Sequence, residues 1–152
     1  MLDKLVALRR RALDAVKHVS FVGPTLARVS VGVVFAATGW GKLHDLEGVT
    51  KFFTELGLPA PGFQAGLVAT TEFLGGLCIL FGLVTRLAAL PLSITMVVAI
   101  VTAKRADIDG VSSLLGLNEW LYLAIFIWLA AAGPGPLSLD RLLGARLDRK
   151  QT

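Results

Sequence analysis

Two ionisable side chains stand alone in long apolar stretches of this sequence, and their chemistry depends on what each one meets. Arg28 is the only charged residue in 20–41, and Glu72 is the only one in 62–83. A charged group in apolar surroundings needs a partner, because leaving it unpaired costs free energy. Three interpretations stay open: an ion pair that fixes helix packing, a polar pocket for a quinone head group or an anion, and a proton relay.

The elements that position these groups are apolar helices. As a helix, the stretch 62–83 is about 33 Å long, which is enough to cross the hydrocarbon core of a bilayer. Hydrophobic residues make up 55% of the 152 residues, and the mean hydropathy is +0.71. We therefore expect an all-α integral membrane four-helix bundle over 20–133, with spans at about 20–41, 62–83, 87–103 and 114–132.

Basic segments flank this domain. Residues 1–19 alternate apolar and basic side chains at helical spacing, which predicts an amphipathic helix lying in the cytoplasmic headgroup layer. The alternative is a solvated basic arm that only fixes the topology. Residues 134–152 form a basic cytoplasmic tail, in which Ser138 is placed to cap a short helix.

The connections carry further structure. Within the segment between the first two spans, 46–56 has apolar side chains at helical spacing and predicts a short amphipathic helix over the mouth of the bundle. The connection at 82–86 is short, so the second and third spans form an antiparallel hairpin with Arg86 at the membrane surface.

The distribution of basic residues predicts the orientation. With four spans both termini lie on one side, and most Lys and Arg residues fall there: Lys4, Arg9, Arg10, Arg11, Lys17, Arg86, Arg141, Arg146, Arg149 and Lys150. The other side has Lys42, Lys51, Lys104 and Arg105. Positive residues favour the cytoplasm, so both termini are expected there, in a multi-pass protein of the bacterial inner membrane.

Helix geometry suggests that the two isolated charges meet. Arg28 lies about 12 Å and Glu72 about 17 Å from the cytoplasmic ends of their spans. An arginine side chain covers such a difference, so we expect an Arg28–Glu72 contact. A second cluster is expected at the outer end, where Lys42 and His44 follow the first span and Glu119 lies about one and a half turns into the fourth. The alternative is that these are solvated interfacial charges. The candidate ligand pocket therefore comprises Arg28, Glu72, Lys42, His44 and Glu119.

Several chemistries do not fit the residues available. Cys78 is the only cysteine, so an internal disulfide and a paired-cysteine redox centre are excluded. His18 and His44 fall on opposite sides of the membrane, which argues against a bis-histidine haem. No metal site is expected. The net charge of +4 resides in the flanks of apolar spans, so it predicts topology rather than nucleic-acid binding.

Taken together, the motifs resemble the DoxX family of small four-span bacterial membrane proteins. The resemblance covers roughly 25–144 and rests on LARVSVGVVFAATGWGKL, EFLGGLCILFGLVTRLAAL and NEWLYLAIFIWLAAAGPGPLSLDRLL. The hairpin and packing positions within these motifs are Gly75, Gly76, Gly82, Thr85 and Arg86. The resemblance implies a membrane subunit tied to redox metabolism, with one branch similar to the quinone-reducing subunit of a thiosulfate oxidoreductase.

The leading hypothesis is a quinone-associated subunit of a membrane redox complex, whose only cofactor would be a bound quinone. Any enzymatic role would be that of an accessory subunit, with a soluble or membrane redox partner supplying electrons. The alternatives are a non-catalytic scaffold or chaperone for partner proteins and a small-molecule or lipid carrier. The oligomeric state stays open, a homo-oligomer included.

Overall fold

A computed structural model describes the backbone of residues 21–148 and the side chains of residues 21–143. The amphipathic helix predicted over 1–19 lies outside these residues, as does the end of the basic tail. All regular secondary structure in the described part is helical: α2 (Val22–His44), α3 (Leu46–Glu55), α4 (Pro61–Phe81), α5 (Thr85–Val101), the 3-10 turn η1 (Arg105–Asp107), α6 (Val111–Leu115), α7 (Asn118–Ala132) and α8 (Leu139–Asp148).

Helices α2 and α4 cross closely because glycines line their contact. A Cβ atom on Gly32 would lie 2.6 Å from the Cα atom of Leu80. Gly39 presses in the same way on the backbone of Phe73, and Gly76 on the backbone of Ala36. The three contacts agree on one antiparallel register, so a step along α2 corresponds to an equal step back along α4. Small residues permit such close approach between membrane helices.

Helix α5 packs against α7, and the core forms where this pair meets α2 and α4. Phe35 of α2 contacts Tyr122 and Phe126 of α7 edge to face, with ring centroids 5.2 and 4.8 Å apart. The buried side chains of this core are Val31, Phe35, Ile79, Ala89, Leu92, Met96, Phe126 and Leu129.

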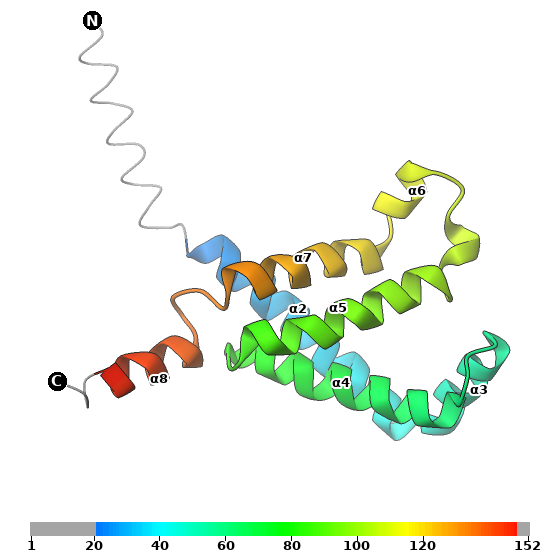
Figure 1. Cartoon of the computed structure of the whole chain (residues 1–152), viewed down its shortest axis with the longest axis horizontal. Helices are drawn as coiled ribbons and strands as arrows, with labels where there is room; N and C mark the ends of the chain where they lie inside the picture. Colours follow the sequence, from blue (N-terminus) through cyan, green and yellow to red (C-terminus); the bar gives the residue numbers. More distant parts are fainter. Residues whose placement is uncertain (1–20, 149–152) are drawn as a thin grey trace, which may run out of the picture.

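The connecting elements gather at two opposite ends of the molecule. The turn between α4 and α5 lies at one end with the start of α2, the end of α7 and α8, while α3, η1 and α6 lie at the other (Figure 1). The turn is tight because Gly82 and Val84 both adopt positive φ angles, of 68° and 45°. Asp140 of α8 accepts hydrogen bonds from the backbone N–H groups of Val84 and Thr85, at 2.8 and 3.3 Å. The start of α8 is therefore attached to the start of α5.

Two of the short helices occur close to where the sequence predicts them. Helix α3 begins after Asp45, whose carboxylate accepts from the Gly48 N–H at 3.0 Å. At α8, the Ser138 hydroxyl accepts from the Arg141 N–H at 3.3 Å, which is the predicted cap. The prediction of one helix over 114–132 is wrong in its first part, because Gly116 ends α6 and a new helix begins at Asn118.

Candidate polar centre between α2 and α4

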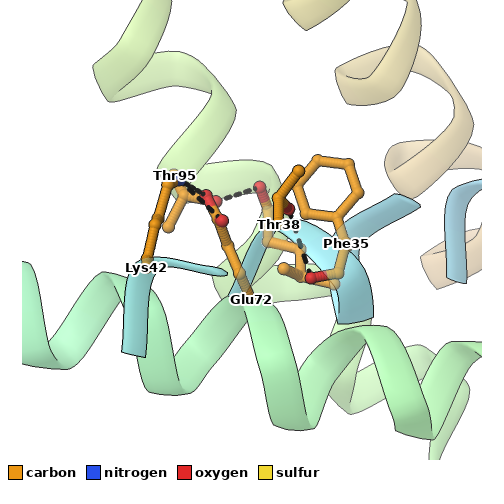
Figure 2. A network of polar contacts seen from close by, with 6 residues as sticks. Phe35, Thr38, Lys42, Glu72 and Thr95 are labelled. Carbon is orange, nitrogen blue, oxygen red and sulfur yellow. Dashed lines mark hydrogen bonds and ion pairs between the residues drawn. The ribbon is translucent and has the colours of Figure 1, made fainter. Parts of the chain in front are cut away.

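Lys42 and Glu72 form the only ion pair between helices among the described residues. The Lys42 Nζ atom lies 2.6 Å from each oxygen of the Glu72 carboxylate (Figure 2). The two partners differ in accessibility: the Glu72 side chain is 4% exposed and that of Lys42 is 33% exposed. The buried carboxylate is thus paired with an ammonium group that is still accessible from outside the protein.

Two hydroxyl groups accompany this pair. Figure 2 draws Thr38 of α2 and Thr95 of α5 in the same polar network. Each hydroxyl donates to a carbonyl of its own helix, Thr38 to Phe35 at 3.2 Å and Thr95 to Leu92 at 2.8 Å. Their oxygen atoms therefore keep lone pairs that can accept a further hydrogen bond.

The level of Thr95 follows from the packing of the α4–α5 hairpin. A Cβ atom on Gly75 would be 3.0 Å from the Leu92 side chain, so these two residues face each other. One turn further along α5 and one turn back along the antiparallel α4 bring Thr95 opposite Glu72. Three helices thus contribute polar groups to one level of the bundle. We call the group formed by Thr38, Lys42, Glu72 and Thr95 the polar centre.

Arg28 does not belong to this centre, and the predicted Arg28–Glu72 contact is wrong. Arg28 as a whole residue is 4% exposed. It donates to the backbone carbonyls of Pro134 at 3.0 Å and Leu137 at 2.5 Å, in the segment between α7 and α8. Arg28 therefore holds this connecting segment against the start of α2.

The register of α2 and α4 explains the error. With Gly39 opposite Phe73 and Gly32 opposite Leu80, Glu72 falls beside the last turns of α2. Arg28 instead lies close to Gly82, fourteen residues before Lys42 and so about 21 Å away along the helix. Measuring depth from assumed span ends placed the two charges at one level, whereas the glycine contacts set a different register.

The outer cluster predicted around Glu119 does not form as expected. Lys42 pairs with Glu72 rather than Glu119, and no ion pair among the described residues involves Glu119. His44 is exposed, and its Nδ1 atom lies 2.9 Å from the Trp40 carbonyl oxygen of its own helix. Glu119 is half-buried in the first turn of α7, three residues before Tyr122 and so on the face that meets α2. That these groups line a ligand pocket stays a prediction.

The predicted hairpin and packing residues lie at the α4–α5 hairpin and at two helix contacts. Gly75 and Gly76 are buried against α5 and α2, and Thr85 is buried at the start of α5. Gly82 forms the turn, and Arg86 is exposed beside Gly133. Sequence reasoning missed Thr38, Thr95 and the cap supplied by Asp140. A Thr–Lys spacing of four residues, which puts both side chains on one helix face, was the available indication for Thr38.

Comparisons with known proteins agree on one family. The family model described as DoxX matches residues 23–105. The chain is 36% identical over 131 residues to the inner membrane protein YqjF of Escherichia coli, covering 86% of this chain and 98% of that protein. It is 35% identical over 120 residues to the "Putative oxidoreductase CatD" of Bacillus subtilis, covering 78% of this chain and 85% of that protein. It is also 31% identical over 123 residues to the inner membrane protein YphA of Escherichia coli, covering 76% and 86%. No solved structure matches.

Proposed function

Since the chain belongs to the DoxX family of membrane proteins, we propose that it is a four-span inner-membrane subunit that binds a quinone head group at the polar centre. The proposal has three parts: the placement of the helices in the bilayer, the ligand, and the source of electrons. Each rests on different observations.

The bilayer placement is supported by the surface of the helices. Helices α2 and α4 are long and apolar enough to cross a membrane. Only about a third of the apolar stretch of each helix is buried inside the protein. Large apolar side chains on all four long helices face outward, among them Leu26, Leu67, Ile94 and Ile127. A water-soluble protein rarely exposes apolar surface on this scale, whereas lipid tails cover it favourably.

The shorter helices α5 and α7 span in the same proposal. With 17 and 15 residues they reach about 25 and 22 Å, less than the hydrocarbon thickness. They pack against each other beside the two longer helices. A short span is accommodated by local thinning of the bilayer and by flanking residues that reach the interface. The excess of basic residues on the side of both termini supports a cytoplasmic location for them in this proposal.

The observation that carries the ligand proposal is the unequal exposure of the ion pair. A quinone head group has two carbonyl oxygens, which accept hydrogen bonds and donate none. The Lys42 ammonium group has three protons, and only the Glu72 carboxylate lies within bonding distance of it among the described residues. Because a third of the Lys42 side chain is exposed, a quinone carbonyl oxygen can accept a hydrogen bond from the ammonium group.

Two aromatic rings lie at the same α2–α4 contact, on a different side of it from the ion pair. Trp40 is two residues from Lys42, Phe73 follows Glu72, and their rings lie 5.4 Å apart across the α2–α4 contact. The quinone assignment therefore rests on the donor set of the pair and not on these rings. Glu72 would hold the ammonium group in place, and Lys42 would orient the carbonyl.

The redox part of the proposal assigns electron supply to a partner protein. A bound quinone takes up two electrons and two protons to become a quinol. The sequence has a single cysteine, and the relative CatD carries an oxidoreductase name. In the proposed role this chain positions the quinone in the membrane, and the partner delivers the electrons.

A photoreactive quinone analogue tests this assignment. The protein in lipid nanodiscs is irradiated with an azido-quinone, digested and mapped by mass spectrometry. We expect labelled peptides from the last turns of α2 and the middle of α4, and loss of this label in Glu72→Gln. Excess unmodified quinone should compete with the label in the native protein.

The control is Lys51→Gln, which changes an exposed lysine of α3 outside the polar centre. It should label like the native protein. Labelling confined to the segment around Arg28, or labelling that Glu72→Gln leaves unchanged, would overturn the placement. An unlabelled protein that loses stability in Glu72→Gln would favour the scaffold.

A further inference from the structure

A second polar site lies at the end of the bundle that holds the α4–α5 turn, about 15 Å along α4 from Glu72. It is an open cavity of about 550 Å³ where the α4–α5 turn, the end of α7 and the start of α8 meet. This volume is within the range of small-molecule sites in proteins. The lining combines Arg86, Arg141, Ser138 and Asp140 with apolar Val84, Leu87 and Ala132.

Two exposed guanidinium groups line this cavity. Arg86 is in the first turn of α5, and Arg141 is in the first turn of α8. Gly133, at φ 85°, lets the Arg86 guanidinium group lie against the end of α7, since a Cβ atom there would be 3.1 Å from Arg86 Nε. Among the described residues neither arginine forms an ion pair. Guanidinium groups bind phosphate and carboxylate oxygens in two-pronged hydrogen bonds.

The acidic residue of the lining does not cancel this charge. The two carboxylate oxygens of Asp140 accept from the Val84 and Thr85 N–H groups, so the N-terminus of α5 compensates its charge. Behind the lining, the partners of Arg28 among the described residues are neutral carbonyls, those of Pro134 and Leu137. In the described part of the chain, two lining arginines and the buried Arg28 thus outnumber one engaged carboxylate, which leaves a local excess of positive charge.

We propose that this cavity binds the phosphate of an anionic phospholipid. The apolar part of the lining favours a lipid over a free anion. Leu87 is 67% exposed and Val84 is 48% exposed, and both line the cavity beside the arginines. An acyl chain lies against these side chains while the head group meets Arg86 and Arg141. The inference rests on the four-span placement proposed above, and it is independent of quinone binding.

Native mass spectrometry of the protein with added lipid tests the proposal. Phosphatidylglycerol should bind the native protein and bind the Arg86→Gln/Arg141→Gln double variant about tenfold more weakly, as expected for the loss of charge-assisted contacts. Arg105→Gln, an exposed arginine at the other end, is the matched control and should bind like the native protein. Arg86→Lys/Arg141→Lys should recover part of the affinity, because it restores the charge without the planar fork.

The source of the phosphate is distinguished by two further probes. Inorganic phosphate that binds as tightly as the lipid would overturn the lipid assignment, and so would phosphatidylcholine that binds as tightly as phosphatidylglycerol. Unchanged binding in the Arg86→Gln/Arg141→Gln variant would also overturn it. Quinone photolabelling of the same variant should match the native protein, so failure at this cavity is distinguishable from failure at the polar centre.

Discussion

At the scale of single residues, the most informative feature is that Glu72 is buried and Lys42 is not. A buried ion pair often contributes little net stability, because desolvation of the charges offsets their attraction. Removing one partner is costly, however, when the other stays buried and charged. The two partners of this pair should therefore respond differently to mutation.

We predict that Lys42→Met destabilises the protein more than Glu72→Gln. Lys42→Met leaves the Glu72 carboxylate buried without its cation, at a cost of about 3 kcal/mol. In Glu72→Gln the ammonium group can turn toward the exposed side, so the cost is about 1 kcal/mol. Unfolding in mild detergent measures both, and Lys42→Met/Glu72→Leu should recover most of the loss. Equal destabilisation by the two single variants would contradict the unequal exposure.

Arg28 has a different role, which predicts a different phenotype. Arg28→Met removes the donors to the Pro134 and Leu137 carbonyls, so the segment before α8 should loosen, at a cost of about 2 kcal/mol. Hydrogen exchange should rise in 133–142 and stay unchanged near Glu72. Quinone photolabelling should also stay unchanged. Loss of the label in Arg28→Met with normal exchange would return Arg28 to the quinone site.

At the scale of elements, glycines in α2 and α4 determine which residues meet. Their close approach fixes the antiparallel register, and this register brings Lys42 to Glu72. It also places Arg28 next to the α4–α5 turn. The polar centre is thus a consequence of helix packing as much as of residue type.

Alanine substitutions along this contact should separate packing from helix propensity. Gly76→Ala and Gly39→Ala put a methyl group against backbone of the facing helix, so each should destabilise the protein by about 1–3 kcal/mol. Gly66 lies on α4, as Gly76 does, but has open space around it. Gly66→Ala should therefore be neutral or stabilising by up to about 1 kcal/mol. A Gly76→Ala protein as stable as Gly66→Ala would contradict the close crossing.

The helices could be predicted from the sequence better than the contacts between their side chains. Apolar periodicity and Gly–Pro breaks located the long helices within a few residues, and Ser138 marked the start of α8. The pairing of Lys42 with Glu72 was missed, because a charge at the end of an apolar stretch looks like an interfacial residue. The partner of Lys42 depends on the register between α2 and α4. The spacing of Gly32, Ala36 and Gly39 indicated this register, but depth estimates made for each helix alone did not use it.

At the scale of the whole molecule, the two polar sites lie at different levels of the bundle. The polar centre is at the level of the middle of α4, and the cavity lined by Arg86 and Arg141 is at the α4–α5 turn and the start of α8. In the proposed topology, which puts both termini in the cytoplasm, the cavity faces the inner leaflet and the polar centre lies toward the outer half of the membrane. The side of the membrane from which a redox partner reaches the bound quinone therefore depends on the topology.

Reporter fusions test this orientation. Green fluorescent protein fused after residue 152 should fluoresce, and alkaline phosphatase fused there should be inactive, because the C-terminus is expected in the cytoplasm. Alkaline phosphatase inserted at Gly57, in the exposed turn after α3, should be active. The opposite pattern at either position would reverse the assignment of both sites.

The central claim is that the Lys42–Glu72 pair binds a quinone and does more than hold two helices together. Lipid-extract mass spectrometry tests it on protein purified from native membranes, comparing the native chain with Lys42→Met/Glu72→Leu. We predict that quinone copurifies with the native protein and is lost from the double variant, although the variant stays folded. Quinone retained at native level by the folded variant, or none with the native protein, would contradict the claim.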